Sequence, residues 1–173
     1  MKKILAVMMI LALAAAALAL CGCAKHTHIV VESRRVEDYF CSFYEDGTVD
    51  ITGYYGSAEE LKLPNAINGS KVIGFGIKAF DGCGTIKAVY IPTTVESLPA
   101  KLFNSCPNLE KIYIPQTVVS IGKNAVFNCP AFTTVLFEGT SEQWDAIDVG
   151  SVPWTDNYVL INSEIVFGYS LGK

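Results

Sequence analysis

Three cysteines recur at a fixed interval and are the first candidates for chemistry. Cys83, Cys106 and Cys129 share a 23-residue spacing. On neighbouring strands, equivalent atoms would be roughly 4.8 Å apart, a spacing that a disulfide tolerates, although parallel side chains are poorly aimed for that bond. A metal site would need Cys-x-x-Cys spacing or a nearby histidine. We therefore expect three reduced, buried thiols, with a disulfide or metal site as the alternative, and we expect Cys41 to pack in the N-terminal part of the fold.

Candidates for acid–base or metal chemistry are few. His26 and His28 are the only histidines, and on an extended chain both rings would point to one side. A weak metal-binding tether is conceivable, but two ligands without a third make a poor site, which favours a solvated linker. Glu142, Asp145 and Asp148 recur every three residues, a pattern typical of a solvated helix face. With no imidazole elsewhere for Ser-His-Asp or Cys-His machinery, we predict a non-catalytic protein without cofactor or metal.

A second set of residues suits binding. Tyr90, Tyr113 and Leu136 recur at the same interval as the cysteines, each in a stretch that alternates as a strand does. Exposed tyrosines offer a large contact area at low entropic cost, so this column could accept a peptide or stack against a sugar. Alternatively, the tyrosine pair only stabilises the sheet, and the two roles are compatible. The other residues expected on this outward face are Ala88, Lys111 and Thr134.

The elements that must position these residues follow from a 23-residue repeat. Its order is C-x-x-L-x-x-V-x-I-P-x-x-V-x-x-I-G-x-x-A-F, in which V-x-I alternates as a half-buried strand and the proline ends the ladder. The other apolar positions are spaced at three, which favours tight turns or short 3₁₀ segments. One such unit cannot bury its own apolar face, so we predict that successive units stack into a solenoid. The matching columns are Phe80/Phe103/Val126, Ile86/Leu109/Phe132, Val89/Ile112/Val135, Ile91/Ile114/Phe137 and Pro92/Pro115, and the frame reaches Leu61 after a five-residue insertion around Ile67-Asn68-Gly69.

Two stretches carry a resemblance to a known family. Ile114-Pro115-Gln116-Thr117-Val118-Val119-Ser120-Ile121-Gly122 and Ala79-Phe80-Asp81-Gly82-Cys83 resemble BspA-like leucine-rich repeats, a class found on bacterial surface proteins. The likeness runs from about Phe43 to Phe167. It implies an α/β repeat fold, a short leucine-rich-repeat solenoid of three to four 23-residue coils. The coils would share a parallel β-strand ladder, with a mostly irregular or 3₁₀ convex side. The resemblance also implies contact with a host protein or a neighbouring cell.

The two ends of the array are expected to form caps, because end coils would otherwise expose core and unpaired strand edges. Residues 39–44 and 48–54 flank the turn signal Glu45-Asp46-Gly47 and predict a hairpin. At the other end, Thr140-Ser141-Glu142-Gln143 has capping-box spacing and predicts a short helix. Residues 158–161 and 164–169 are expected to be closing strands.

The N-terminus has the features of an export signal. Met1-Lys2-Lys3 precedes seventeen uninterrupted apolar residues, 4–20. Leu20-Cys21-Gly22-Cys23 resembles the lipobox of bacterial lipoproteins, which implies cleavage before Cys23 and acylation of that residue. A plain signal peptide and an uncleaved anchor remain alternatives, since seventeen residues are near the short limit for a bilayer of about 30 Å.

These observations divide the chain as follows: a lipoprotein signal peptide, 1–22; a lipidated tether, 23–37; an N-terminal β cap, 38–60; leucine-rich repeats, 61–137; and a C-terminal cap, 138–173. The hydrophobic share of 51% argues against a disordered chain. The 13 basic and 17 acidic side chains, with no Lys/Arg cluster, argue against nucleic-acid binding.

We therefore predict a cell-surface lipoprotein, held to the membrane by an N-terminal lipid, that recognises a protein or glycan on a host or neighbouring cell. The candidate ligand-binding residues are Tyr90, Tyr113, Lys111, Thr134 and Leu136, and the lipid attachment site is Cys23. A structural envelope lipoprotein and a solute-capturing lipoprotein of a transporter are the alternatives.

The lipobox generates a direct test. The native protein should begin at Cys23, and its intact mass should lack residues 1–22 and include acyl chains. Replacing Cys23 by serine should abolish the added lipid mass. A native protein that retains Met1 would contradict the lipoprotein prediction.

Overall fold

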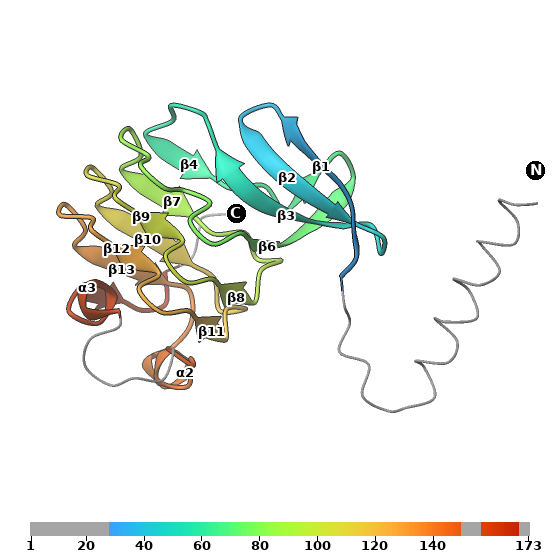
Figure 1. Cartoon of the computed structure of the whole chain (residues 1–173). Coiled ribbons are helices and arrows are strands. Elements are labelled where there is room, and N and C mark those ends of the chain that lie inside the picture. Colours follow the sequence, from blue (N-terminus) through green and yellow to red (C-terminus); the bar gives the residue numbers. More distant parts are fainter. Residues whose placement is uncertain (1–27, 150–156, 170–173) are drawn as a thin grey trace, which may run out of the picture.

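The computed structural model describes residues 28–149 and 157–169. In Figure 1, strands β4, β7, β10 and β13 lie side by side as successive rungs, with strands β1–β3 at one end and helices α2 and α3 near the other. The predicted signal peptide, Cys23 and His26 lie outside the described residues. Within the described ranges, no helix has both the length and the apolar character needed to cross a bilayer.

The main sheet is a ladder of five parallel strands in the order β14-β13-β10-β7-β4. Lys111 pairs with Ala88 on one side and Thr134 on the other, its equivalents in the preceding and following coils. The same register lines up Ile112 with Val89 and Val135, which confirms the predicted solenoid. The strands are β4 (Glu60–Lys62), β7 (Ala88–Tyr90), β10 (Lys111–Ile114), β13 (Thr134–Phe137) and β14 (Glu164–Val166).

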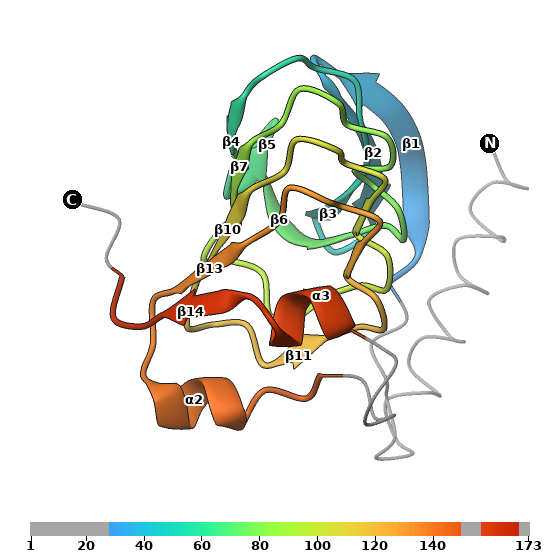
Figure 2. The ribbon, with the colours of Figure 1, turned by 90° about the vertical axis from the view of Figure 1, so that its left-hand side faces the viewer.

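The hydrophobic core lies inside the coils, between this ladder and the convex side. Val89, Ile112 and Val135 are fully buried, and the rings of Phe80 and Phe103 stack with centroids 5.2 Å apart. Figure 2 shows the coils as nested turns that share this interior. The convex side is irregular, as expected, apart from two short parallel ladders. These join β8 (Ser97–Leu98) to β11 (Ser120–Ile121), and β9 (Phe103–Asn104) to β12 (Val126–Phe127).

A second sheet, in the order β1-β2-β3-β6-β5, closes the N-terminal end. Its β2–β3 hairpin is the predicted one, and Cys41 is buried within it. The five-residue insertion becomes the β5–β6 hairpin, whose turn residues Asn68 and Gly69 both have positive φ, as a type I′ turn requires. The strands are β1 (Val30–Val36), β2 (Tyr39–Tyr44), β3 (Thr48–Tyr54), β5 (Ala66–Ile67) and β6 (Ser70–Phe75).

Strand β1 differs from the sequence prediction. Its residues fall in the predicted tether, 23–37, yet they pair antiparallel with β2. β1 lies at the sheet edge and is mostly exposed on both faces, so its sequence lacks the alternation that signals a half-buried strand. The Arg34 guanidinium lies 5.0 Å from the centroid of the Phe43 ring and covers that side chain. The N-terminal cap therefore begins earlier than position 38.

The C-terminal cap confirms one element and corrects another. Helix α2 (Ser141–Asp145) begins at Thr140, whose hydroxyl accepts a hydrogen bond from the Gln143 N–H at 3.3 Å, in the predicted capping box. Residues 158–161, expected to be a strand, form the single-turn helix α3 (Tyr158–Ile161). Their short apolar run fits either element, and one helical turn buries Leu160 while Tyr158 faces solvent. The strand expected over 164–169 is the shorter β14.

Asn157 attaches this cap to the last coil. It lies outside the columns of the repeat, so the 23-residue spacing does not predict this role. It is completely buried and has a left-handed backbone, with φ of 69°. Its side-chain oxygen accepts from the Ala125 N–H at 2.8 Å, and its amide donates to the Gly122 carbonyl at 3.0 Å. Its own N–H donates to the side chain of Asn124 at 3.3 Å. One side chain thus supplies the backbone partners that a further coil would otherwise provide.

Replacing Asn157 by alanine should destabilise the fold measurably. Both side-chain hydrogen bonds are lost and alanine must adopt a positive φ, so we expect the free energy of unfolding to fall by about 2 kcal/mol. Urea denaturation followed by circular dichroism measures this. Asn162→Ala is the matched control, because Asn162 is exposed and bonds only locally, to the Tyr158 carbonyl. Equal midpoints for the two variants would contradict this role.

Candidate functional site

The outward face of the main ladder carries two columns of side chains that the register holds in line. One column begins with Glu60 on β4 and continues through Ala88, Lys111, Thr134 and Glu164. The other column begins with Lys62 and continues through Tyr90, Tyr113, Leu136 and Val166. The structure therefore brings all five predicted ligand-binding residues onto one face.

Exposure along this face departs from the prediction at two positions. Tyr90, Lys111, Thr134 and Leu136 are partly exposed. Tyr113, expected to face solvent, is only 8% exposed, and Ala88 is also buried. The Tyr90 ring stacks on Tyr113 with centroids 3.8 Å apart and nearly parallel planes. From the other side, the Tyr169 ring lies 5.0 Å from the same Tyr113 ring.

A hydrogen bond and a cation–π contact add to the ring stacking of Tyr90 and Tyr113. A hydrogen bond with Tyr113, followed by burial, raises the pKa of the Tyr90 hydroxyl. The ammonium group of Lys62 lies 5.4 Å from the Tyr90 ring centroid. Such cross-strand stacking is a contact that stabilises sheets, and Tyr90 still presents part of its surface to solvent, so both proposed roles of the column are compatible with this geometry.

Tyr169 is a site residue that sequence reasoning missed. It follows β14, outside the 23-residue frame, so no column indicated its place. After β14 the chain turns back over β13, where the Gly168 N–H donates to the Gly139 carbonyl at 3.0 Å and the Tyr169 N–H to the Phe137 carbonyl at 3.2 Å. These two bonds hold the aromatic ring over the end of the ladder.

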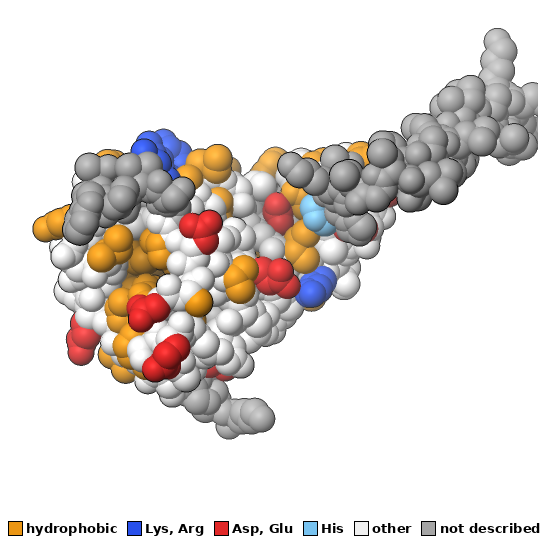
Figure 3. Space-filling model, turned by 90° about the horizontal axis from the view of Figure 1, so that it is seen from below, with side chains coloured by type: hydrophobic (Ala, Val, Ile, Leu, Met, Phe, Trp, Pro, Cys, Tyr) orange, Lys and Arg blue, Asp and Glu red, His pale blue; other side chains and the backbone are white. Residues whose placement is uncertain are grey.

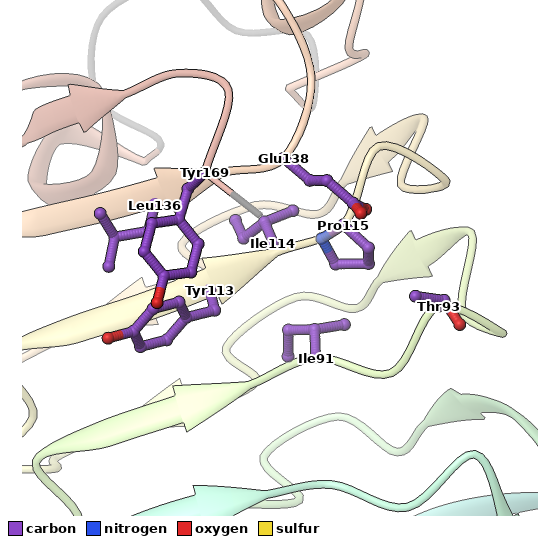
Figure 4. A pocket seen from close by; sticks show the side chains of 8 residues that line it. All are labelled: Ile91, Thr93, Tyr113, Ile114, Pro115, Leu136, Glu138 and Tyr169. Carbon is purple, nitrogen blue, oxygen red and sulfur yellow. The ribbon is translucent and has the colours of Figure 1, made fainter. Parts of the chain in front are cut away.

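A pocket of about 170 Å³ opens beside Tyr169, at the carboxyl ends of β7, β10 and β13. Figure 4 shows Tyr113, Tyr169 and Leu136 on one side of it, and Pro115 and Glu138 on the other. Glu138 is the only Asp, Glu, Lys, Arg or His side chain in this lining, and it accepts a hydrogen bond from the Gln116 N–H at 3.3 Å. The full lining is Ile91, Thr93, Tyr113, Ile114, Pro115, Leu136, Glu138 and Tyr169.

The composition of this pocket suits binding. Aliphatic and aromatic walls can hold an apolar side chain or the face of a sugar ring, while a carboxylate and tyrosine hydroxyls can fix its orientation. Across residues 28–149 and 157–169, no group of three or more His, Cys, Asp or Glu side chains is arranged to hold a metal ion. His28, expected in a solvated linker, instead lies with Nδ1 3.0 Å from the Asp46 carboxylate.

The remaining candidate residues are placed elsewhere. Glu142 and Asp145 lie exposed on the short helix α2, as expected of a solvated face. Asp148, expected on the same face, instead lies beyond the helix, where it forms a parallel bridge with Ser120. Hydrogen bonding from Thr140 lowers the pKa of the Glu142 carboxyl. The thiols of Cys106 and Cys129 are buried, but Cys83, the first of the column and also expected to be buried, is partly exposed.

Apolar side chains also gather on the surface seen from below. Figure 3 views the molecule from below, the side on which α2 and β11 lie in Figure 1, and shows hydrophobic side chains gathered among several Asp and Glu residues. Val119, immediately before β11, is 60% exposed. Because Val119 is not part of the pocket lining, it offers an apolar surface position for comparison with that site.

The stacked coils and parallel ladder define a leucine-rich-repeat solenoid. The sequence matches the BspA type leucine rich repeat region, in six copies, over residues 54–146. The chain therefore belongs to the BspA-type leucine-rich-repeat family, whose members are generally surface or binding proteins. None of the curated protein sequences matches it.

Two solved leucine-rich-repeat structures are similar to this chain, and the first of them supports the fold. A leucine-rich repeat protein from Bacteroides capillosus is 18% identical, with a TM-score of 0.58, over 78% of this chain and 98% of that one. The T. pallidum leucine rich repeat protein is 20% identical, with a TM-score of 0.47, over 61% of this chain. The alignment spans 60% of the T. pallidum chain. At these identities, the likeness bears on the fold alone.

The tyrosine stack generates a stability prediction. Tyr113→Ser removes a buried ring between two others and should lower the free energy of unfolding by about 3 kcal/mol, whereas Tyr113→Phe keeps the ring and should cost far less. Thermal or urea unfolding measures both variants. Tyr158→Ser is the control, since Tyr158 is 66% exposed. If Tyr113→Ser is as stable as the control, the stack is not structural.

Proposed function

We propose that this protein is a lipid-anchored recognition protein of the bacterial surface that binds a protein or glycan on a host or neighbouring cell. It acts without catalysis, by presenting the outward face of its ladder and the adjoining pocket. The observation that carries this proposal is the pocket itself, in which side chains from three successive coils and the C-terminal segment converge. Such convergence of apolar walls with few polar groups is typical of binding sites.

The side chains around the pocket support a ligand of moderate size. Tyr90, Lys111 and Thr134 are partly exposed on strands next to the pocket, so a bound peptide or oligosaccharide could extend from the pocket across the ladder. Tyrosine-rich surfaces bind with little loss of side-chain entropy. Tyr113 supports this surface from beneath, because its burial leaves little of its ring for direct contact.

The proposed attachment also supports recognition. An acylated Cys23 would lie seven residues before β1, which holds the solenoid close to the membrane surface. Removal of residues 1–22 takes away Lys2 and Lys3, which leaves 11 basic and 17 acidic side chains and makes the formal net charge of −4 more negative, −6. This charge does not assist binding to anionic lipid, so acyl chains would supply the attachment.

Binding can be tested with the unlipidated chain that starts after Cys23. Glycan arrays and pull-downs from host-surface and envelope extracts would identify a partner, whose Kd is then measured. Tyr169→Ala should weaken binding at least about tenfold, because it removes one wall of the pocket. Glu138→Gln should weaken it if the ligand donates a hydrogen bond or carries positive charge.

Two exposed residues provide matched controls. Tyr158→Ala removes an exposed tyrosine from α3, and Val119→Ala trims an exposed apolar side chain outside the pocket lining, so both should leave Kd unchanged. A partner that binds Tyr169→Ala as tightly as the native sequence would eliminate the pocket as its site. A chain that captures no partner under any of these conditions would favour the structural envelope role.

A further inference from the structure

The thiols of successive coils form a continuous line on the convex side. Strands β9 and β12, which pair in parallel, end two residues before Cys106 and Cys129 respectively. Each of these two thiols reaches back toward the preceding coil: Cys106 donates to the Phe80 carbonyl at 2.9 Å, and Cys129 lies 3.6 Å from the Phe103 carbonyl. The Gly82 N–H donates to the Asn104 carbonyl at 2.8 Å, and the Ser105 N–H to the Phe127 carbonyl at 2.9 Å, so the segments that carry neighbouring cysteines run side by side. Hydrogen bonding between the thiols places each sulfur beside the next one in the column.

The three thiols differ in access and acidity. Cys83 is partly exposed, and hydrogen bonding with Cys106 lowers the pKa of its thiol, against opposing effects of burial and the Asp81 carboxylate. Cys106 is fully buried; a hydrogen bond with Cys129 lowers its pKa, but its hydrogen bond with Cys83 and burial raise it to about 12. Cys83 is thus both more accessible to solvent and more acidic than Cys106, the buried thiol beside it.

The backbone also distinguishes the two neighbouring pairs. Cys83 is flanked by Gly82 and Gly84, and a side chain at either glycine would meet no atom within 4 Å. Cys106 and Cys129 are each followed by a proline, which restricts the residue before it. A disulfide needs Cβ atoms about 3.8 Å apart, closer than an ideal ladder places them. The glycine-flanked segment can make that small shift, whereas the Cys106–Cys129 pair has no comparable freedom.

From this arrangement we propose that Cys83 is a peroxide-reactive site and that Cys106 is its resolving thiol. The Cys83 thiolate attacks hydrogen peroxide, which forms an S–O bond, breaks the O–O bond and releases hydroxide, leaving a sulfenic acid. The Cys106 sulfur then attacks the Cys83 sulfur, so that an S–S bond forms and the S–O bond breaks. Hydroxide leaves and takes the Cys106 proton as water. In total, two thiols are oxidised, one peroxide is reduced, and two waters are released.

The resulting bond would link two adjacent coils. It closes a loop of more than twenty residues and so restricts the unfolded chain. The oxidised protein should unfold at a higher temperature than the reduced protein, and a dithiol reductant should reverse the shift. This site lies on the convex side and does not depend on the proposed binding face.

The test uses the full chain in detergent with Cys21→Ser and Cys23→Ser, which leaves four thiols. Iodoacetamide should alkylate Cys83 at least about tenfold faster than Cys41, Cys106 or Cys129. Equimolar peroxide should remove two hydrogen atoms from the intact mass, and peptide mapping should find the Cys83–Cys106 link. With Cys106→Ser, the same treatment should leave a sulfenic acid on Cys83 that dimedone traps.

Cys129→Ser is the matched control, because it removes a thiol of the same column yet should leave the Cys83–Cys106 link intact. A Cys106–Cys129 link in the native column would overturn the proposal. So would alkylation or oxidation of Cys83 no faster than that of the buried thiols. Each readout is made on folded protein, verified by circular dichroism before oxidation.

Discussion

The structure depends on one constraint: a single coil of the repeat cannot satisfy its own backbone or bury its own apolar face. A strand of three or four residues obtains its backbone hydrogen bonds from the parallel strands on either side. Its apolar side chains are buried only because equivalent residues, such as Val89, Ile112 and Val135, share one interior. Stability therefore accumulates along the stack, and every coil needs a partner on each side. The two ends of the array are the places where that need is not met.

The two caps meet this need in different ways. At the N-terminal end, a mixed sheet, in which only β3 and β6 pair in parallel, covers the first coil. The β5–β6 hairpin, made by an insertion in the repeat, joins that sheet to the solenoid. At the C-terminal end, β14 extends the ladder by one strand, while the buried Asn157 bonds to the last convex turn. A sheet can cover a whole coil. The side-chain amide of Asn157 can form hydrogen bonds only with the few backbone groups of the last coil that β14 leaves without a partner.

Sequence spacing predicts what the repeat controls and fails where the repeat ends. Columns such as Cys83, Cys106 and Cys129, and the pairing of Tyr90 with Tyr113, follow directly from the 23-residue register. The burial of a side chain does not follow from this register, because Tyr113 is covered by Tyr169, a residue outside the 23-residue frame. β1 and α3 were misassigned for a related reason: an edge strand exposed on both faces and a four-residue apolar run carry no periodicity that distinguishes strand from helix.

Register also decides where a specific site can arise. A side chain in one coil always meets its equivalent in the next, as when Ser120 donates to Ser97 at 2.8 Å, so a regular column produces a uniform stripe. The pocket forms where this uniformity stops. Pro92 and Pro115 occupy one column, and its third member is Glu138, which brings a carboxylate to the pocket. Tyr169 adds a wall from outside the repeat, so the last coil combines the ladder's fixed geometry with side chains that no other coil carries.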